Sequence, residues 1–248
     1  MSLRSLVAAT GVLVLCLTGC AAGGTGRAIG ATIPHASGAT SVTPTTLTTE
    51  DFAGRVLTAV RAAQTVTVTK TTTYQEGEGG TVVTQADYYD DGVNLQVRTL
   101  DAGGTVVGEI RLVEGALYSR AGDAGHFVQL DDAAAESFEA ADPFATIESF
   151  DGAIVAVEPT GEPIEVDGVS VQAYRVVLDR DLLAGNLPAS EDWHLDQLPE
   201  RLVYEYGVGA DDLIRWMRAD LASVAFEATV DGWGEGAPIV APAPDELG

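Results

Sequence analysis

Side chains that could support catalysis or metal binding are few and widely separated in this chain of 248 residues. The three histidines, His35, His126 and His194, form no HExxH motif and no pair spaced by four residues, so no zinc site is expected. The sequence also contains no G-x-S-x-G nucleophile motif and no glycine-rich phosphate loop between an expected strand and helix. We therefore predict that the protein is not an enzyme and that it has no catalytic residue, metal site or cofactor.

The charge balance is strongly acidic, with 37 aspartates and glutamates against 13 lysines and arginines and a formal net charge of −24. A chain of this kind has no extended basic surface, so we expect no nucleic acid and no anionic headgroups bound by such a surface. Lys70 is the only lysine. This preference for arginine, together with abundant alanine, glycine and valine, fits a GC-rich genome and hence an actinobacterial source.

Cys20 is the residue whose position predicts a covalent modification. It follows an apolar run, residues 6–18, which has about the length of a signal-peptide core and is short for a membrane span. The sequence Leu17-Thr18-Gly19-Cys20 resembles the bacterial lipobox, which implies cleavage before Cys20 and attachment of acyl chains such as palmitate to it. Two alternatives stay open, namely an ordinary cleavable signal with a chance cysteine and an uncleaved anchor.

Acylation would hold the protein on the outer face of the cell membrane, because two or three acyl chains form a durable anchor where one does not. The expected organisation is a lipoprotein signal peptide at residues 1–19, the lipidated cysteine with a flexible tether at 20–48, and a single domain at 49–248. Only Cys16 and Cys20 are cysteines, so the mature domain has no disulfide and depends on its hydrophobic core.

The domain opens with a long amphipathic helix, expected over residues 50–64. Phe52, Val56 and Val60 recur at helical spacing and form an apolar stripe that must pack on something. From residue 65 the hydrophobic period changes to two. Short alternating segments separated by Gly/Asp turns then predict an antiparallel meander up to residue 130.

Two short helices are expected at 132–141 and 144–150, with strands from 153 to 230 and an extended Gly/Pro-rich tail from 232. This order of elements places the helices on one face of an antiparallel sheet, which is the α+β arrangement. Because a twisted sheet of many strands tends to curl, we expect a curled antiparallel half-barrel. The N-terminal helix and the short mid-chain helices should pack on its concave face.

Several stretches carry a resemblance to a known fold: LYSRAGDAGHFVQLDD, DPFATIESF, DGVSVQAYRVVLD, LPERLVYEYGVG and DGWGEGAPIVAPAPDEL. Together with the order of elements, they resemble the LolA-type fold and, more particularly, the actinobacterial LppX/LprG group of envelope lipoproteins. This resemblance implies a cavity between the sheet and the helices, which binds acylated lipids in members of the group. It covers about residues 49–243.

The candidate lining of such a cavity consists of large apolar side chains from both kinds of element. The helices supply Phe52, Val56, Val60, Phe144, Ile147 and Phe150, and the strands supply Leu95, Val97, Leu112, Tyr174, Leu202, Tyr204, Met217 and Phe226. The alternative that these side chains fill a solid core stays open, because a sequence does not show unfilled space.

The predicted function is a carrier of a lipid or other hydrophobic ligand in the cell envelope. Such binding needs no catalytic group, since burial of an acyl chain supplies the affinity. The alternative is a non-enzymatic accessory module that docks on an envelope protein through its sheet or its acidic face.

Overall fold

The computed structural model describes residues 46–74, 77–90, 92–138, 142–186, 198–221 and 224–248. The expected signal peptide, Cys20 and all but the last residues of the tether lie outside these ranges, so their assignment stays a prediction. The helices are α1 (Phe52–Ala63), α2 (Asp132–Phe138), α3 (Ala145–Phe150) and α4 (Arg180–Asn186). None of these helices is both long and apolar enough to cross a membrane.

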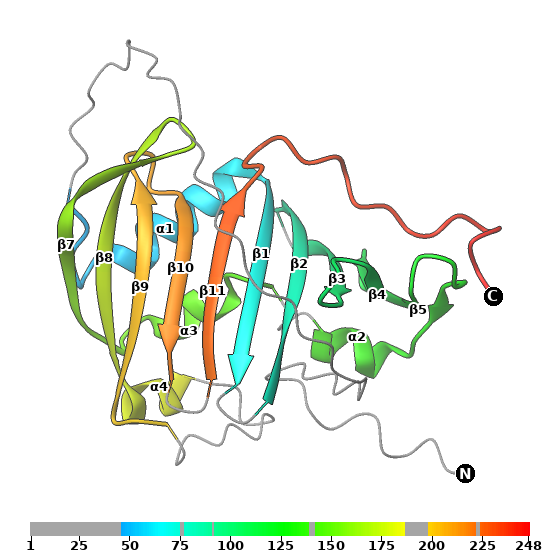
Figure 1. Cartoon of the computed structure of the whole chain (residues 1–248), viewed down its shortest axis with the longest axis horizontal. Helices are drawn as coiled ribbons and strands as arrows, with labels where there is room; N and C mark the ends of the chain where they lie inside the picture. Colours follow the sequence, from blue (N-terminus) through cyan, green and yellow to red (C-terminus); the bar gives the residue numbers. More distant parts are fainter. Residues whose placement is uncertain (1–45, 75–76, 91, 139–141, 187–197, 222–223) are drawn as a thin grey trace.

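The described strands form one antiparallel sheet (Figure 1). They are β1 (Thr65–Tyr74), β2 (Gly77–Tyr89), β3 (Gly92–Leu100), β4 (Val106–Val113), β5 (Ala116–Ala121), β6 (Val128–Gln129), β7 (Ile154–Val166), β8 (Val169–Asp179), β9 (Arg201–Gly209), β10 (Ile214–Asp220) and β11 (Val224–Asp231). Their order is β6-β5-β4-β3-β2-β1-β11-β10-β9-β8-β7. Two meanders, one from each half of the chain, are therefore joined side by side through the pair β1–β11.

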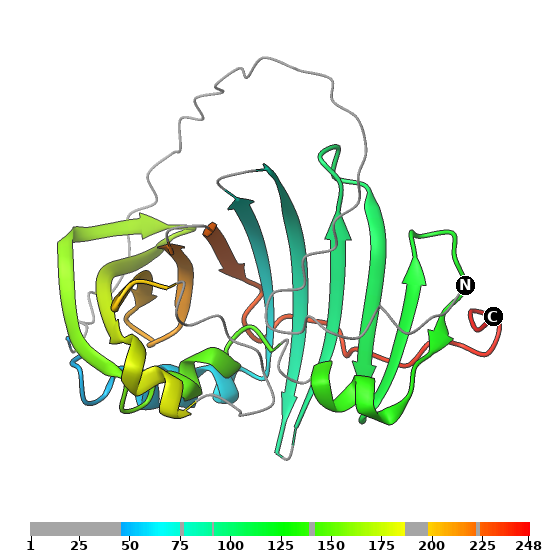
Figure 2. The ribbon, with the colours of Figure 1, turned by 90° about the horizontal axis from the view of Figure 1, so that it is seen from below.

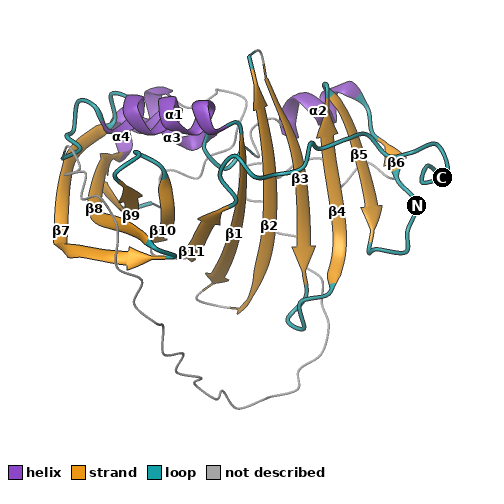
Figure 3. Ribbon diagram, turned by 90° about the horizontal axis from the view of Figure 1, so that it is seen from above, coloured by secondary structure: helices purple, strands orange, loops and turns teal. Residues whose placement is uncertain are grey.

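The sheet is curled, most strongly on the side of β7 to β10 (Figure 2). All four described helices lie on the same side of it, α1, α3 and α4 beside β7–β11 and α2 beside β5 (Figure 3). The predicted α+β half-barrel with helices on one face is confirmed. Two details differ, because α1 begins at Phe52 rather than at residue 50 and β7 runs unbroken where two shorter strands were expected.

Alternation along the strands gives the sheet two chemically different faces. In β1, Val66 and Val68 are buried under the helices, whereas Thr67 and Thr69 point the other way. Directly paired residues of neighbouring strands share a face, so this assignment extends across the whole sheet. We call the side of Val66 the helix face and the side of Thr67 the open face.

The start of α1 explains where the packed part of the chain begins. The Thr48 amide donates to the Asp51 carboxylate at 2.6 Å, and the Phe52 amide donates to the Thr48 carbonyl at 3.0 Å. Leu47 is only 2% exposed, and its amide donates to the Tyr174 hydroxyl at 3.2 Å. Ordered packing thus includes Leu47, two residues before the expected start of the domain.

The C-terminal tail crosses the open face of the N-terminal meander in an extended path (Figure 3). The Gln85 amide donates to the Ala237 carbonyl at 3.0 Å, and Arg111 donates to the Val240 carbonyl at 3.4 Å. At its end the tail pairs with Phe127, whose amide donates to the Glu246 carbonyl at 2.8 Å. These contacts hold the tail against β2 and β4 and attach its end beside β6, at the edge of the sheet.

A buried carboxylate lies on the open face beside this tail. Glu109 of β4 is 0% exposed and accepts hydrogen bonds from Arg111 at 2.8 Å, from Arg120 at 2.5 and 3.1 Å, and from Gln96 at 2.5 Å. The guanidinium groups of Arg111 and Arg120 each lie 4.7 Å from the ring centroid of the fully buried Phe127. The charge of Glu109 therefore organises the two arginines that hold Phe127.

Candidate functional site

The predicted lining residues come together on the helix face in one apolar cluster. Twelve of the fourteen are buried: Phe52, Val56, Val60, Phe144, Ile147, Phe150, Leu95, Val97, Leu112, Tyr174, Leu202 and Met217. The other two, Tyr204 and Phe226, are only partly buried. Burial of this extent makes most of the set part of the protein's own core.

Aromatic contacts fill the space between the helices and the sheet. The ring of Phe52 in α1 lies 5.3 Å from that of Tyr206, and the ring of Phe150 in α3 lies 5.1 Å from that of Tyr204. Phe144, just before α3, lies 5.6 Å from Trp233, whose indole donates to the Ile214 carbonyl. Under α1 and α3, the apolar stripes therefore pack directly on side chains of the sheet.

A polar pair that sequence reasoning missed positions the start of α3. The Tyr88 hydroxyl of β2 donates to the Asp142 carboxylate at 2.6 Å, and the same carboxylate accepts the Phe144 amide at 2.9 Å. Burial raises the pKa of Asp142 above its ordinary value, although both of these hydrogen bonds oppose the shift. Asp142 thus ties the segment before α3 to the edge of the helix face.

The close packing stops farther along β1 and β11, where apolar side chains remain partly accessible. Lys70, Thr72, Val82, Tyr204 and Phe226 share the helix face here, and solvent reaches all five. The register pairs Lys70 with Val82 and Thr72 with Phe226, and the rings of Phe226 and Tyr204 lie 6.2 Å apart. We call these five residues the Lys70 patch.

Two ionisable groups report the character of this patch. Neighbouring side chains desolvate the Lys70 ammonium, which disfavours its charged form and lowers its pKa, although the side chain is solvent-accessible. Burial likewise raises the pKa of Tyr204 to about 12. Both shifts favour the neutral form, because neighbouring apolar side chains desolvate the two groups.

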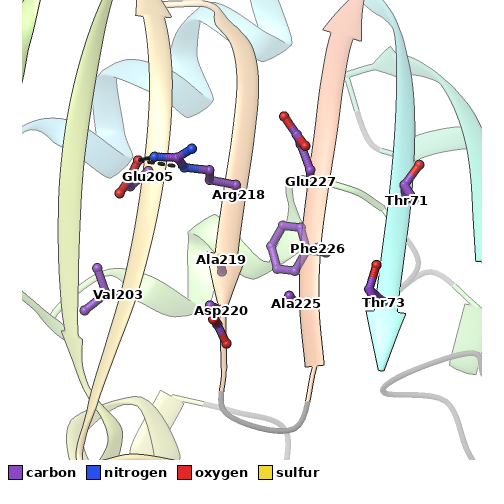
Figure 4. A pocket seen from close by; sticks show the side chains of 10 residues that line it. All are labelled: Thr71, Thr73, Val203, Glu205, Arg218, Ala219, Asp220, Ala225, Phe226 and Glu227. Carbon is purple, nitrogen blue, oxygen red and sulfur yellow. Dashed lines mark hydrogen bonds and ion pairs between the residues drawn. The ribbon is translucent and has the colours of Figure 1, made fainter. Parts of the chain in front are cut away.

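Two hollows lie on the open face, and the larger reaches Phe226, one of the predicted lining residues. The larger, about 460 Å³, is bordered by Thr71, Glu205, Arg218 and Glu227 (Figure 4), and a neighbouring one of about 300 Å³ shares Arg218 and Glu227. Arg218 donates to the Glu205 carboxylate at 2.8 and 2.5 Å. The charged and hydroxyl groups suit a polar partner, and Val203, Ala225 and Phe226 add apolar surface to the larger hollow.

Comparisons with known proteins show the fold. No protein-family model matches the sequence, and neither does a curated protein sequence. Among solved structures, LprF from Mycobacterium bovis is similar with a TM-score of 0.50 at 14% identity, over 78% of this chain and 97% of that one. The lipoprotein LppX of Mycobacterium tuberculosis is similar with a TM-score of 0.52 at 11% identity, over 77% of this chain and 98% of that one.

The chain has the fold of LprF and LppX. The LolA-like architecture implied by the sequence resemblance is thereby confirmed, including the open, curled sheet. The stretch DGWGEGAPIVAPAPDEL, one of those behind that resemblance, has a structural role here, since its Trp233 packs on Phe144. At these identities the likeness concerns the fold alone.

Sequence reasoning also missed Lys70, although the signal was present. In the segment Thr65–Tyr74, Lys70 has the same parity as Val66 and Val68, so strand alternation places it on the apolar face. A single lysine at a position where strand alternation predicts an apolar residue was therefore a signal that the sequence contained.

Proposed function

We propose that this protein is a non-enzymatic envelope lipoprotein that binds or carries a lipid or other hydrophobic ligand on its helix face. Cys20 would anchor it to the outer face of the cell membrane through acyl chains. The fold shared with LppX, which is itself a lipoprotein, supports this proposal, as does the lipobox-like sequence before Cys20.

The Lys70 patch is the observation that carries the proposal. It joins the apolar cluster under α1 and α3, yet Phe226, Tyr204 and Val82 keep part of their surface accessible. Covering apolar surface stabilises a complex by about 25 cal/mol per Å². An acyl chain lying along the patch and reaching toward the core would obtain its affinity in this way.

Purification without detergent tests the carrier function. We expect the chain from residue 20 onward, which retains every described residue, to carry cellular lipid that appears in native mass spectra as non-covalent adducts. Denaturation should remove the adducts and yield the lipid in the organic extract. Spectra of the unliganded mass only, together with no binding of an added acyl probe, would contradict the proposal.

An accessory module that docks on an envelope protein is the second candidate function. The charged hollows around Arg218 and Glu227 favour it, because they offer a polar surface on the face opposite the helices. Failure of lipid binding in the experiment above would leave this open face as the functional surface.

The anchor has a separate test. Changing Cys20 to alanine removes the thiol that lipidation requires, so we expect metabolic labelling with an alkyne fatty acid to disappear from the protein. Changing Cys16 to alanine is the matched control, since Cys16 lies within the expected signal peptide and its loss should leave labelling unchanged. Equal label on the Cys20 variant and the natural protein would refute the lipobox assignment.

A further inference from the structure

We propose that Lys70 binds the anionic headgroup of the lipid, a carboxylate or a phosphate, while the acyl chain lies on Phe226, Tyr204 and Val82. This inference rests on the proposed lipid-binding function and adds to it the chemical class of the ligand. It assigns the ligand's polar end to one side chain of β1.

Ion pairing among the described residues singles out Lys70. Every arginine in the described ranges has a carboxylate within 4.0 Å: Arg55, Arg61, Arg98, Arg111, Arg120, Arg175, Arg180, Arg201, Arg215 and Arg218. Lys70 takes part in none of these pairs. In a chain of net charge −24, a cation without a carboxylate partner in the described ranges is the exception.

The surroundings of Lys70 explain what an anion would supply. Its register partners are Val82 on β2 and Ala228 on β11, and its ammonium lies 6.0 Å from the ring centroid of Phe226. Although Lys70 is exposed, its ammonium loses part of its hydration beside apolar groups without gaining a partner, and this partial loss lowers the pKa of Lys70. A ligand anion would replace the missing partner with a charge-assisted hydrogen bond.

A lipid fits these surroundings better than a free anion does. The side chains next to Lys70 on the helix face are apolar, apart from Thr72 two residues along β1 and the buried Thr84, diagonal to Lys70 on β2. One ammonium and two threonine hydroxyls make a small polar site for a hydrated ion, whereas an amphiphile also covers Phe226 and Val82. The head and the chain of one molecule thus match two adjoining parts of the patch.

The acidity of the whole protein does not prevent this contact. Charges separated by more than about 8 Å are largely screened at physiological ionic strength. Neighbouring side chains desolvate Lys70 and lower its pKa. No described carboxylate forms an ion pair with its ammonium, so none neutralises it at short range.

A pair of fluorescent probes that differ only in charge tests the inference. We would titrate the chain from residue 20 onward with cis-parinaric acid and with its uncharged methyl ester. Changing Lys70 to methionine should lower the affinity for the acid about tenfold, the equivalent of about 1.4 kcal/mol, and leave the affinity for the ester unchanged. Lys70→Arg should retain the preference for the acid.

Arg175→Met is the matched control. It removes the same charge from a half-exposed side chain of the open face, whose nearest carboxylate, Glu158, is 4.0 Å away. Its affinities for both probes should equal those of the natural protein. Thermal melting of each variant checks that the fold is intact before the affinities are compared.

The outcomes separate the inference from the proposed function. Binding of neither probe to the natural protein would overturn the lipid-binding function itself. Binding of both probes, with the same ratio of acid affinity to ester affinity in the Lys70→Met variant, would overturn the role of Lys70 alone.

Because Lys70 is the only lysine, amine-specific labelling read by peptide mass spectrometry adds a direct readout. Bound cis-parinaric acid should slow the labelling of Lys70, whereas inorganic phosphate should not. If phosphate protected Lys70 equally well, the site would bind free anions, and the proposed role in binding a lipid headgroup would be wrong.

Discussion

Replacing Glu109 with glutamine is expected to lower the free energy of unfolding by about 3–5 kcal/mol, because one partner of a buried ion pair is lost while the other remains. The carboxylate is 0% exposed and bound by Arg111, Arg120 and Gln96. Without its charge, the partly buried Arg111 beside Phe127 has no carboxylate partner among the described residues, and Arg120 keeps only Asp123 at 3.7 Å. Chemical denaturation at pH 7 measures the loss, and the melting temperature should fall by roughly 10 °C.

The control for this variant is Glu158→Gln. Glu158 is an exposed residue of β7 at 4.0 Å from Arg175, and exposed pairs contribute about 0–1 kcal/mol. A loss of similar size in both variants would mean that Glu109 stabilises the protein no more than a surface carboxylate does.

The pH dependence of stability gives a second readout for Glu109. Burial alone raises its pKa, but hydrogen bonds from Arg120, Arg111 and Gln96 outweigh burial and hold the pKa below its ordinary value. A carboxyl whose pKa is lowered by folding stabilises the protein above its unfolded pKa of about 4.3. The stability difference between the natural protein and Glu109→Gln should therefore be full at neutral pH and shrink as the pH falls through the lowered pKa.

Tryptophan at two positions of the helix face should have opposite consequences. Val60 of α1 is 1% exposed in the packed cluster, so Val60→Trp overpacks the core and should cost about 1–3 kcal/mol. Val82 of the Lys70 patch is partly exposed, so Val82→Trp should change stability by no more than about 0.5 kcal/mol. It should nevertheless remove most acyl-probe binding, because the indole occupies the surface on which the chain would lie.

Melting curves and the parinaric methyl ester titration measure both effects in the same samples. An uncharged probe is the suitable one here, since it reports the apolar contact independently of Lys70. If Val82→Trp bound the ester as the natural protein does, the acyl chain would not lie on this part of β2. If Val60→Trp lost binding without loss of stability, the space beneath α1 would be the ligand cavity, as the sequence originally suggested.

The architecture could be predicted from local patterns in the sequence. The change of hydrophobic period near residue 65 and the Gly/Asp turns correctly marked the end of α1 and most strands, because each depends on neighbours within a few residues. The start of α1 was placed two residues early, since Asp51 interacts with the Thr48 amide and the helix begins only after it.

The features that depend on distant contacts could not be predicted in this way. Strand alternation places Glu109 on the other face of the sheet from Ile110 and Leu112. Its burial, however, depends on Arg120 and on Phe127, which pairs with the end of the chain. The candidate lining raises the same difficulty. Apolar side chains such as Val56 and Phe226 look alike in sequence, yet the first is fully buried and the second remains partly accessible.

The pairing of β1 with β11 makes assembly of the sheet depend on the end of the chain. Thr67–Tyr74 pairs with Val224–Asp231, so the central junction closes only when the last strand is present. Such distant pairing is slow to form, and until then β1 is an unprotected edge that can pair with other chains. A chain that ends before Val224 would keep its N-terminal meander but expose this edge, and would be prone to aggregation before it could serve as a carrier.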